Sequence, residues 1–511
     1  MRPMGDRIRG VVIAWLLLSS ASPGQFQLYE FQGPPSLGSK VRLLQDANGD
    51  GFADIYARDP RTVFSGKDGS SIDWSHGGDP IGDLNADGYE DYLIVVAGSC
   101  SDCRDAVIHS GSDQSQLFVI HFVPNYGHEV WGFPNYSVGD VNGDGITDIA
   151  IVDEVHGLGF NLVFVYSGAD GMLLYELRGY NPRVSPTSFG RYLASEFDVD
   201  GDGCSDLVIG DNYLDVNKDY STDGLVDVYS GKSGTLLYRF LGPGTFWTSF
   251  FGSFVAGLGD LNADGRDEFC YMDASRRIQV INGSDGSPLF GPIPGNSACR
   301  APDLDGDGNA ELVLFDYTTG NCLLFSAGLV DFTISMPELL GKNGTLEGGK
   351  DVNRDGTPDF VLGAPDVDIG GQPTGLVRAF ALCHKARFAN YGSGYPGTLG
   401  IPSISLNAPP VMGSTVLLEL GNSLGAATIG VLFIGPDPAD IDSSWGGDLL
   451  VASRFPPVLI PLGPAGGSIP LAVPDNLPFC GLALYWQILE SDPGAAHGVS
   501  FSPGLEIVLG R

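Results

Sequence analysis

Seven copies of one nine-residue pattern supply the side chains in this 511-residue chain that could bind metal ions. The pattern reads Asp-x-Asp/Asn-x-Asp-Gly-x-x-Asp/Glu, and its copies begin at Asp46, Asp83, Asp140, Asp198, Asp260, Asp303 and Asp351. Ca²⁺ prefers about six to eight hard oxygen ligands, and positions 1, 3 and 5 place short carboxylate or amide side chains on one side of a tight loop. Glycine at position 6 takes a backbone conformation that a side chain would forbid, and the acid at position 9 closes the cage.

The pattern predicts up to seven structural Ca²⁺ sites. Polar turns between strands have no reason to keep this spacing, and without metal the carboxylates of each loop would repel one another. The predicted ligands, at positions 1, 3, 5 and 9 of each copy, are Asp46, Asn48, Asp50, Asp54, Asp83, Asn85, Asp87, Asp91, Asp140, Asn142, Asp144, Asp148, Asp198, Asp200, Asp202, Asp206, Asp260, Asn262, Asp264, Glu268, Asp303, Asp305, Asp307, Glu311, Asp351, Asn353, Asp355 and Asp359.

The residues after each copy exclude an EF-hand. An EF-hand needs a bidentate Glu at position 12 and flanking helices. Here position 12 is apolar or aromatic in every copy, as in Ile94, Ile209 and Leu362, and position 10 is apolar or aromatic as well. Short apolar runs with β-branched residues are typical of strands buried on both faces. The loops are therefore predicted to lead into strands, with position 7 contributing only its carbonyl and free to vary in side chain.

The segments around the loops also repeat. Start-to-start spacings run from 37 to 62 residues, which is about one supersecondary unit each. A Val-x-Ser-Gly segment or a near variant follows each of the first five loops, as at 165–168, and a turn and a fourth strand come next, as at 173–179 and 236–242. Four strands per unit predict an all-β fold, a seven-bladed β-propeller. Residues 26–33 are similar to these fourth strands and are predicted to complete the last unit, which lacks one.

These motifs resemble the FG-GAP (VCBS) repeats of the integrin α-subunit type of propeller. The resemblance rests on the Phe-Gly anchors at 189–190 and 251–252, the acidic loops and the apolar strands that follow them. Repeats 2 and 7 depart from it, because Ser75 and Asn343 stand where the anchor glycine belongs. The resemblance implies one bound Ca²⁺ per loop and a secreted or cell-surface protein of adhesion and recognition. The propeller is predicted to span 25–385.

Acidic residues outnumber basic ones by 62 to 27, giving a net charge of −35. Such a chain repels nucleic acids and anionic membrane surfaces at long range, so neither is an expected partner. No cluster of Lys or Arg is visible along the sequence, which disfavours acidic polysaccharides as ligands. A neutral glycan is compatible with this charge. Trp74, Trp247 and Trp445 could stack on sugar rings, although core or rim packing is the commoner role of tryptophan.

Residues 1–24 have the pattern of a secretory signal peptide, with basic residues before the apolar run 11–18 and small residues after it. Cleavage is expected after Ala21, with Gly24 as the other option. No later stretch is long enough to span a membrane. The sequence therefore predicts a secreted or surface-located protein without a membrane span.

The eight cysteines are too sparse to define a disulfide-stapled scaffold. Cys100 and Cys103 form a Cys-x-x-Cys pair, for which a local disulfide and two free thiols both remain open. The overall pairing remains open as well.

The acidic repeats stop near residue 385. Residues 386–400 are rich in Gly and Tyr and are predicted to be a linker. Beyond them, apolar or alternating runs are separated by Pro and Gly, which predicts a small β-sandwich over 401–511. The runs are 415–420, 427–434, 469–473, 479–489 and 505–509.

A catalytic site is not expected. Residues 421–425 spell the Gly-x-Ser-x-Gly nucleophile elbow around Ser423, and Asp492 and His497 follow in the chain order of a hydrolase triad. The elbow needs a strand, a turn and a helix in an α/β sheet, and this region has no helical periodicity, so a β-turn is the better interpretation. His121 and His128 are interpreted as surface-loop residues.

The leading hypothesis is a non-catalytic, calcium-stabilised scaffold for recognition or adhesion, with an extracellular protein or glycan as its partner. A lectin-like protein that binds a neutral glycan is the first alternative. An extracellular polysaccharide-degrading enzyme is the second, and no carboxylate pair outside the acidic loops argues for it.

Overall fold

The structure is a computed structural model that describes residues 27–98, 104–122, 136–155, 160–179, 188–215, 222–243, 250–326, 328–474 and 480–511. In these residues the protein is all-β apart from one 3₁₀ helix, η1 (Pro337–Leu339), and no helix there is long and apolar enough to cross a membrane. The described chain forms two compact units, Gln27–Asp303 with Asp307–Leu382 and Cys383–Arg511 with Leu304–Gly306. The predicted signal segment and the pair Cys100 and Cys103 lie outside the described residues.

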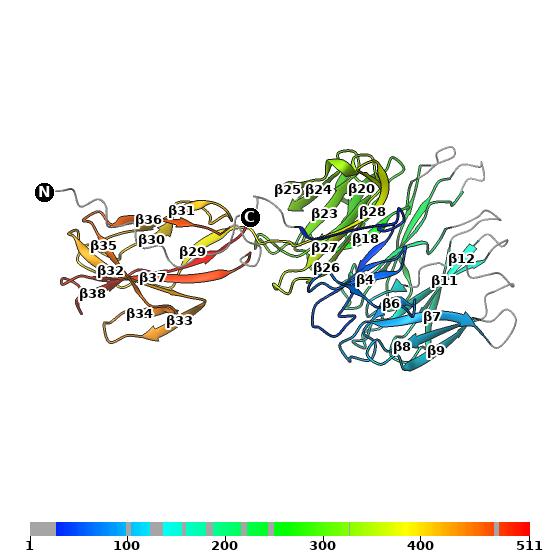
Figure 1. Cartoon of the computed structure of the whole chain (residues 1–511), viewed down its shortest axis with the longest axis horizontal. Coiled ribbons are helices and arrows are strands. Elements are labelled where there is room, and N and C mark those ends of the chain that lie inside the picture. The colour runs from blue at the N-terminus through cyan, green and yellow to red at the C-terminus, as the bar shows by residue number, and fades with distance from the viewer. Residues whose placement is uncertain are drawn as a thin grey trace. The chain divides into compact units, whose positions relative to one another are not determined.

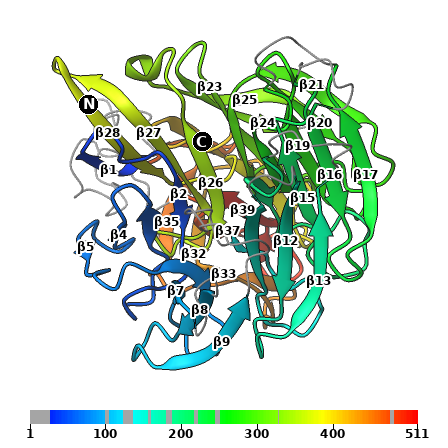
Figure 2. The same cartoon turned by 90° about the vertical axis from the view of Figure 1, so that its right-hand side faces the viewer.

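Seven antiparallel four-stranded sheets make up the first unit, which we call the seven-sheet unit (Figure 1). In Figure 2 the colours follow chain order around this unit. Six of the sheets use four consecutive strands. They are β2 (Val41–Leu43), β3 (Ile55–Ala57), β4 (Thr62–Phe64) and β5 (Ser71–Ile72); β6 (Asp79–Gly82), β7 (Asp91–Ala97), β8 (Arg104–His109) and β9 (Gln116–Phe122); β10 (Tyr136–Ser137), β11 (Ile149–Val155), β12 (Phe160–Tyr166) and β13 (Leu173–Arg178); β14 (Tyr192–Ala194), β15 (Leu207–Asp211), β16 (Leu225–Tyr229) and β17 (Leu236–Leu241); β18 (Val255–Gly259), β19 (Glu268–Met272), β20 (Arg277–Ile281) and β21 (Pro288–Pro294); and β22 (Ser297–Ala301), β23 (Glu311–Asp316), β24 (Asn321–Ser326) and β25 (Leu329–Ser335).

The seventh sheet joins the two ends of this unit. It contains β26 (Thr345–Lys350), β27 (Asp359–Ile369), β28 (Gln372–Phe380) and the first strand of the described chain, β1 (Gln27–Gly33). β1 pairs antiparallel with β28, placing Phe31 opposite Val377 and Gly33 opposite Gly375. The prediction that this N-terminal segment supplies the missing fourth strand is confirmed for the described residues.

The second strand of each sheet begins with residues buried on both faces, because successive side chains point to opposite faces and each face packs on a different sheet. In β15, Leu207 and Ile209 share a core with Val163 of the preceding sheet. Val208, between them, shares a second core with Phe269 of the following sheet. The apolar runs that follow the acidic loops are thus inner strands, as predicted.

Neighbouring sheets share such cores along the chain. The seventh sheet shares a core with the sheet β2–β5, and its strand β26 contacts β22 and β23. The first strands of all seven sheets line one cavity of about 610 Å³. The arrangement is propeller-like.

The C-terminal unit contains a larger sheet with the strand order β29 (Arg387–Tyr391), β39 (Gly504–Val508), β37 (Ala483–Ser491), β32 (Thr428–Gly435) and β35 (Val458–Leu462), with β38 (Val499–Phe501) paired to β37. A second sheet contains β30 (Ile404–Leu406), β31 (Thr415–Leu420) and β36 (Gly467–Ala472). β33 (Asp437–Asp442) and β34 (Asp448–Ala452) form a hairpin. Side chains of the two larger sheets share one core, with Leu418 and Ile488 fully buried in it.

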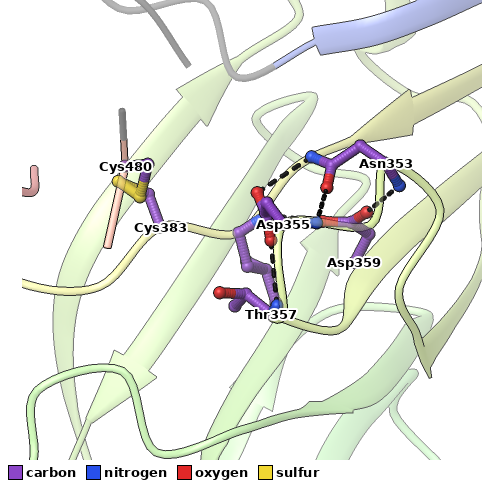
Figure 3. Close-up of a disulfide and its surroundings, with 7 residues drawn as sticks. Asn353, Asp355, Thr357, Asp359, Cys383 and Cys480 are labelled. Carbon is purple, nitrogen blue, oxygen red and sulfur yellow. Dashed lines mark hydrogen bonds between the residues drawn. A yellow bond between two sulfur atoms is a disulfide. The ribbon is translucent and has the colours of Figure 1, made fainter. Parts of the chain in front are cut away.

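All five apolar runs predicted in this unit coincide with strands: β31, β32, β36, β37 and β39. Part of the expected linker 386–400 is also a strand, because β29 pairs with β39. A disulfide joins Cys383 and Cys480 within the unit (Figure 3). Among the described residues of the seven-sheet unit, the cysteines are buried free thiols: Cys204, Cys270, Cys299 and Cys322.

Candidate metal centres

Each acidic loop connects the first two strands of its sheet, so the loops occupy equivalent places in all seven sheets. The loop at Asp46 lies between β2 and β3, and the loop at Asp351 lies between β26 and β27. The prediction that the loops lead into strands is confirmed. Because the sheets repeat, the fold presents seven copies of the same donor set.

Two left-handed residues shape each loop. Position 6 is glycine in every copy, with φ between 83° and 92°. In six copies a Cβ at this glycine would meet nothing within 4 Å, so the backbone conformation, and not space, requires glycine. Position 4 is also left-handed in every copy, although Ala86, Ala263 and Arg354 occupy it in three loops, with φ of 56–57°. This second turn was not predicted.

Backbone N–H groups hold the carboxylates of positions 1 and 5 in place. In all seven loops the N–H of position 6 donates to the position 1 carboxylate at 2.6–2.9 Å. The N–H of position 7 donates to Oδ1 of position 5 at 2.8–3.1 Å, also in all seven. Figure 3 shows the second bond between Thr357 and Asp355. The loops are therefore ordered by their own backbone.

The position 9 acid is buried in each loop, at most 1 % exposed in all seven. In six loops it accepts the N–H of position 2 at 2.6–2.9 Å. In five loops its other oxygen accepts the N–H of the glycine that ends the third strand's Val-x-Ser-Gly segment or its variant. The acid thus ties the loop to this segment, although 12 to 25 residues separate the two partners in the chain.

That downstream glycine is required by close approach. A Cβ on Gly66, Gly111, Gly168, Gly231 or Gly283 would lie 1.8–2.2 Å from the carbonyl oxygen of loop position 8, far inside any real contact. The glycine therefore lets the third strand's end approach the loop closely enough for its N–H to reach the buried acid.

Burial raises the pKa of six of the position 9 acids, and neighbouring loop carboxylates raise it further. The pKa is raised to about 6 for Asp91 and Asp148, to about 7 for Asp54, Asp206 and Glu268, and to about 8 for Asp359. Carboxylates this crowded and this buried are compatible with a cation among them.

Two loops bring three carboxylates closest together. Oxygens of Asp198, Asp200 and Asp206 all lie within 4.8 Å of one another, and the same holds for Asp303, Asp305 and Glu311. Their position 5 residues, Asp202 and Asp307, are not part of these groups. Acidic groups at these two places could hold a metal ion.

The other five loops have asparagine at position 3, so the amide supplies one oxygen. In three of them the amide N–H₂ donates to the position 5 carboxylate at 2.9–3.0 Å, as from Asn353 to Asp355 (Figure 3). The amide oxygen accepts the N–H of position 5 in the same loops.

Neighbouring loops are bonded to one another, which sequence reasoning did not predict. In four pairs, the N–H of position 8 donates to the carbonyl of position 1 in the preceding loop, at 2.8–2.9 Å. Position 8 is Glu90 in the second loop, and its buried carboxylate also accepts the N–H of Gln45 at 2.8 Å. Position 7 is not free either, because Arg266 donates to the carbonyl of Val199 in the preceding loop. No signal in a single copy of the motif would have found these contacts.

The donor set fits a hard divalent cation such as Ca²⁺. Every candidate ligand side chain offers carboxylate or amide oxygen, with no sulfur or imidazole among them. Oδ1 of Asp200 is buried without a hydrogen-bond partner inside one of the three-carboxylate groups. An unpartnered buried carboxylate oxygen is costly unless a cation compensates it.

The hydrolase triad suggested by residue order is not assembled. Ser423 is buried, and its Oγ lies 2.7 Å from Oε2 of Glu490 and 3.1 Å from Oδ2 of Asp492. His497 lies beside Tyr395 instead, with ring centroids 6.4 Å apart. A serine bonded directly to two carboxylates, with no imidazole between, has no base arranged as in a triad.

The other aromatic and histidine candidates are placed as follows. Trp74 is 7 % exposed and donates to the carbonyl of Gly78, so it is a core residue. Trp445 is 44 % exposed in the C-terminal unit. His121 is an exposed residue of strand β9 that contacts Asp105, and Trp247 and His128 lie outside the described residues.

No model of a protein family matches the sequence. The chain is similar to integrin alpha-E of Mus musculus, 26 % identical over 180 residues that cover 29 % of this chain and 15 % of the integrin. It is also similar to integrin alpha-3 of Cricetulus griseus, 30 % identical over 145 residues that cover 25 % of this chain and 13 % of the integrin. The matches thus span less than a sixth of these relatives. This weak similarity supports an integrin-alpha-like propeller.

Solved structures give more distant likenesses. A crystal structure of BBS1N in complex with ARL6DN, soaked with mercury, has a TM-score of 0.42 and 10 % identity, covering 70 % of this chain and 96 % of that chain. The exotype rhamnogalacturonan lyase YesX has a TM-score of 0.35 and 15 % identity, covering 94 % of this chain and 72 % of that chain. Neither likeness supports a functional assignment.

Proposed function

We propose that this protein is a secreted, non-catalytic recognition protein built on a calcium-stabilised seven-bladed β-propeller over 25–385, followed by a β-sandwich over 401–511. Two observations support seven blades. Each four-stranded sheet packs against the next, and the seventh packs against the first. The first strands of all seven also line one cavity.

The observation that carries the calcium role is the buried acid at position 9, present in every loop. Carboxylates of positions 1 and 5 crowd it in five loops, and those of positions 1 and 3 crowd it in the other two. Ca²⁺ would be held by positions 1, 3, 5 and 9, which offer carboxylate or amide oxygens. A bound cation would neutralise the buried acids and, by mass action, stabilise the folded loops. The loops are ordered by the chain's own residues, because backbone N–H groups already orient the carboxylates.

The recognition role rests on the similarity to integrin alpha chains and on the absence of an assembled triad among the described residues. The expected partner is an extracellular protein or glycan. Export is proposed from the signal-like segment 1–24, and the disulfide between Cys383 and Cys480 is compatible with an oxidising compartment.

The test is a binding panel of extracellular proteins and polysaccharides against the purified chain, with Ca²⁺ and with EGTA, alongside native mass spectrometry to count bound ions. We expect up to seven Ca²⁺ and saturable binding of one ligand class that is lost in EGTA. Release of soluble products from a polysaccharide would overturn the non-catalytic role. A folded chain that binds no Ca²⁺ would overturn the metal role.

A further inference from the structure

The cavity of the seven-sheet unit is a second site, separate in chemistry from the acidic loops. Its volume of about 610 Å³ lies in the range of small-molecule sites. Every sheet contributes its first strand to the wall, through residues such as Arg42 of β2, Tyr192 of β14 and Arg300 of β22.

Basic side chains that are far apart in the sequence come together in this cavity. Six basic residues line it, against three acidic ones, Asp79, Glu196 and Glu347. The basic residues are Lys40, Arg42, Arg58, Arg191, Arg276 and Arg300. They are six of only 27 Lys and Arg in a chain of net charge −35. The expectation that the protein has no cluster of basic side chains is therefore wrong, and the ground on which acidic ligands were disfavoured is removed.

The three acids offset only part of this positive charge; Glu196 pairs with Arg300 of the same wall at 3.4 Å. Asp79 forms an ion pair with Arg61, which is not a lining residue, at 3.2 Å. Burial raises the pKa of Glu347 to about 7, so it carries only part of a charge at neutral pH. The cations crowd one another: burial first, and then the charges of Arg58 and Arg42, lower the pKa of Lys40 to about 8.

The wall also holds buried polar atoms without partners. They are the Tyr56 hydroxyl, Nε of Arg276 and Oδ1 of Asn296, all in residues that line the cavity. Buried polar groups are normally hydrogen-bonded, so unpartnered ones at a cavity wall point to a ligand or ordered solvent as their partner. Arg276 is fixed between the rings of Phe250 and Tyr317, 4.7 and 4.5 Å from their centroids, which pre-organises its guanidinium.

We propose that this cavity is a binding site for a small organic polyanion, one that carries carboxylate or phosphate groups. Arginine forks match the geometry of both groups, and the aromatic and amide side chains of the wall suit the organic body between them. The inference rests on the recognition role proposed above and names the ligand class of that role. Acidic residues elsewhere on the chain oppose binding only weakly at physiological salt, because exposed charges more than about 8 Å away are largely screened.

The test is isothermal titration calorimetry on the full chain in saturating Ca²⁺ with three probes. Trigalacturonic acid presents carboxylates, glucose 1,6-bisphosphate presents phosphates, and maltotriose is the uncharged control. We expect binding of at least one charged probe with a Kd below about 1 mM, weakening as salt increases, and none of maltotriose. The charged probe that binds identifies the acid group.

Two variants and a matched control locate the site. Arg191→Gln and Arg58→Gln are each expected to weaken binding about tenfold, the loss of one good charge-assisted contact. Arg178→Gln removes the same charge from an exposed side chain of β13 that does not line the cavity, and is expected to leave binding unchanged. Unchanged melting temperatures show that the variants fold. No binding of either charged probe by folded protein, or equal loss in all three variants, overturns the proposal. If binding fails while Ca²⁺ still raises the melting temperature, only the cavity inference falls; if Ca²⁺ does not bind, the metal role falls as well.

Discussion

The two units bury carboxylates in opposite ways. In the seven-sheet unit, each position 9 acid faces other carboxylates, and its pKa is raised where a shift is resolved. In the C-terminal unit, Asp492 is also fully buried, yet its pKa is lowered. Burial acts to raise it, but hydrogen bonds from Thr398, Gly494 and Ser423 outweigh burial.

The difference lies in what surrounds the acid. Thr398 donates both its N–H and its hydroxyl to Asp492, each at 2.6 Å, which stabilises the charged form although the Glu490 carboxylate lies on the other side of Ser423. The acids of six loops accept two or three backbone N–H groups, but two further carboxylates of the same loop lie beside each of them. We expect an acid whose charged form is favoured by hydrogen bonds to be stable without a cation, and an acid crowded by two other carboxylates to be stabilised by one. The predictions below test this contrast, beginning with the largest expected effect.

Removing divalent cations should lower the stability of the seven-sheet unit and leave that of the C-terminal unit unchanged. With EGTA, the seven-sheet unit is expected to unfold at a temperature lower by about 10 °C or more, because several sites each lose mass-action stabilisation of about 2–3 kcal/mol. The C-terminal unit is expected to keep its transition. Differential scanning calorimetry with hydrogen-exchange mass spectrometry would assign the transitions. A loss of stability in EGTA confined to the C-terminal unit would contradict the interpretation that the loop acids, and not Asp492, are stabilised by a cation.

Breaking the disulfide should give the converse result. The double variant Cys383→Ala with Cys480→Ala opens a link across 97 residues and is expected to cost the C-terminal unit about 2–4 kcal/mol. Denaturant unfolding followed by hydrogen exchange would measure it. The calcium-dependent transition of the seven-sheet unit serves as the internal control and should not move.

Substituting Asp492→Asn should destabilise the C-terminal unit by about 1–3 kcal/mol, because one of its donors loses its acceptor. The loss should be equal in Ca²⁺ and in EGTA, since dipoles hold this acid. Urea unfolding in both conditions measures it. A loss that depends on Ca²⁺ would place a cation at this cluster and contradict the interpretation.

The same substitution in a loop, Asp200→Asn, should raise the stability of the unit in EGTA and lower it in Ca²⁺. Asparagine already occupies position 3 in five loops, so the backbone accepts it. In EGTA, removing a charge that raises the pKa of Asp206 is expected to stabilise the unit by up to about 1 kcal/mol. In Ca²⁺, weaker binding at this loop should make the variant less stable than the parent. Destabilisation in both conditions would mean that charge crowding is unimportant there.

The smallest effect should come from Ala86→Gly. Ala86 is left-handed with φ of 56°, which costs alanine energy that glycine does not pay. We expect a gain of about 0.5 kcal/mol in both Ca²⁺ and EGTA, because backbone conformation and charge are independent terms. Urea unfolding measures it, and Ala57→Gly in strand β3 is the control expected to destabilise.

Much of the architecture could be predicted from repetition. One acidic loop is a weak signal, but seven with apolar runs behind them indicated the strands, their burial on both faces and the strand that β1 adds to β28. A signal that is not local was missed: the segment 386–400, predicted to be a linker from its Gly and Tyr content, contains β29, whose partner β39 lies more than a hundred residues away in the chain. The side chain at position 7 was treated as free to vary, and the contact of Arg266 with the preceding loop shows that it is not free in every copy.

The sequence alone determined the candidate metal ligands, because all four side chains of a loop lie within nine residues and the local backbone brings them together. Only the tertiary structure decided the cavity and its charge. Arg58 follows β3, Arg191 precedes β14 and Arg300 lies in β22, and nothing in their spacing shows that the first strands converge. The ligands of a site formed by one turn are close together in the sequence and can be recognised there. A site formed where several sheets converge depends on packing between segments that are distant in the chain.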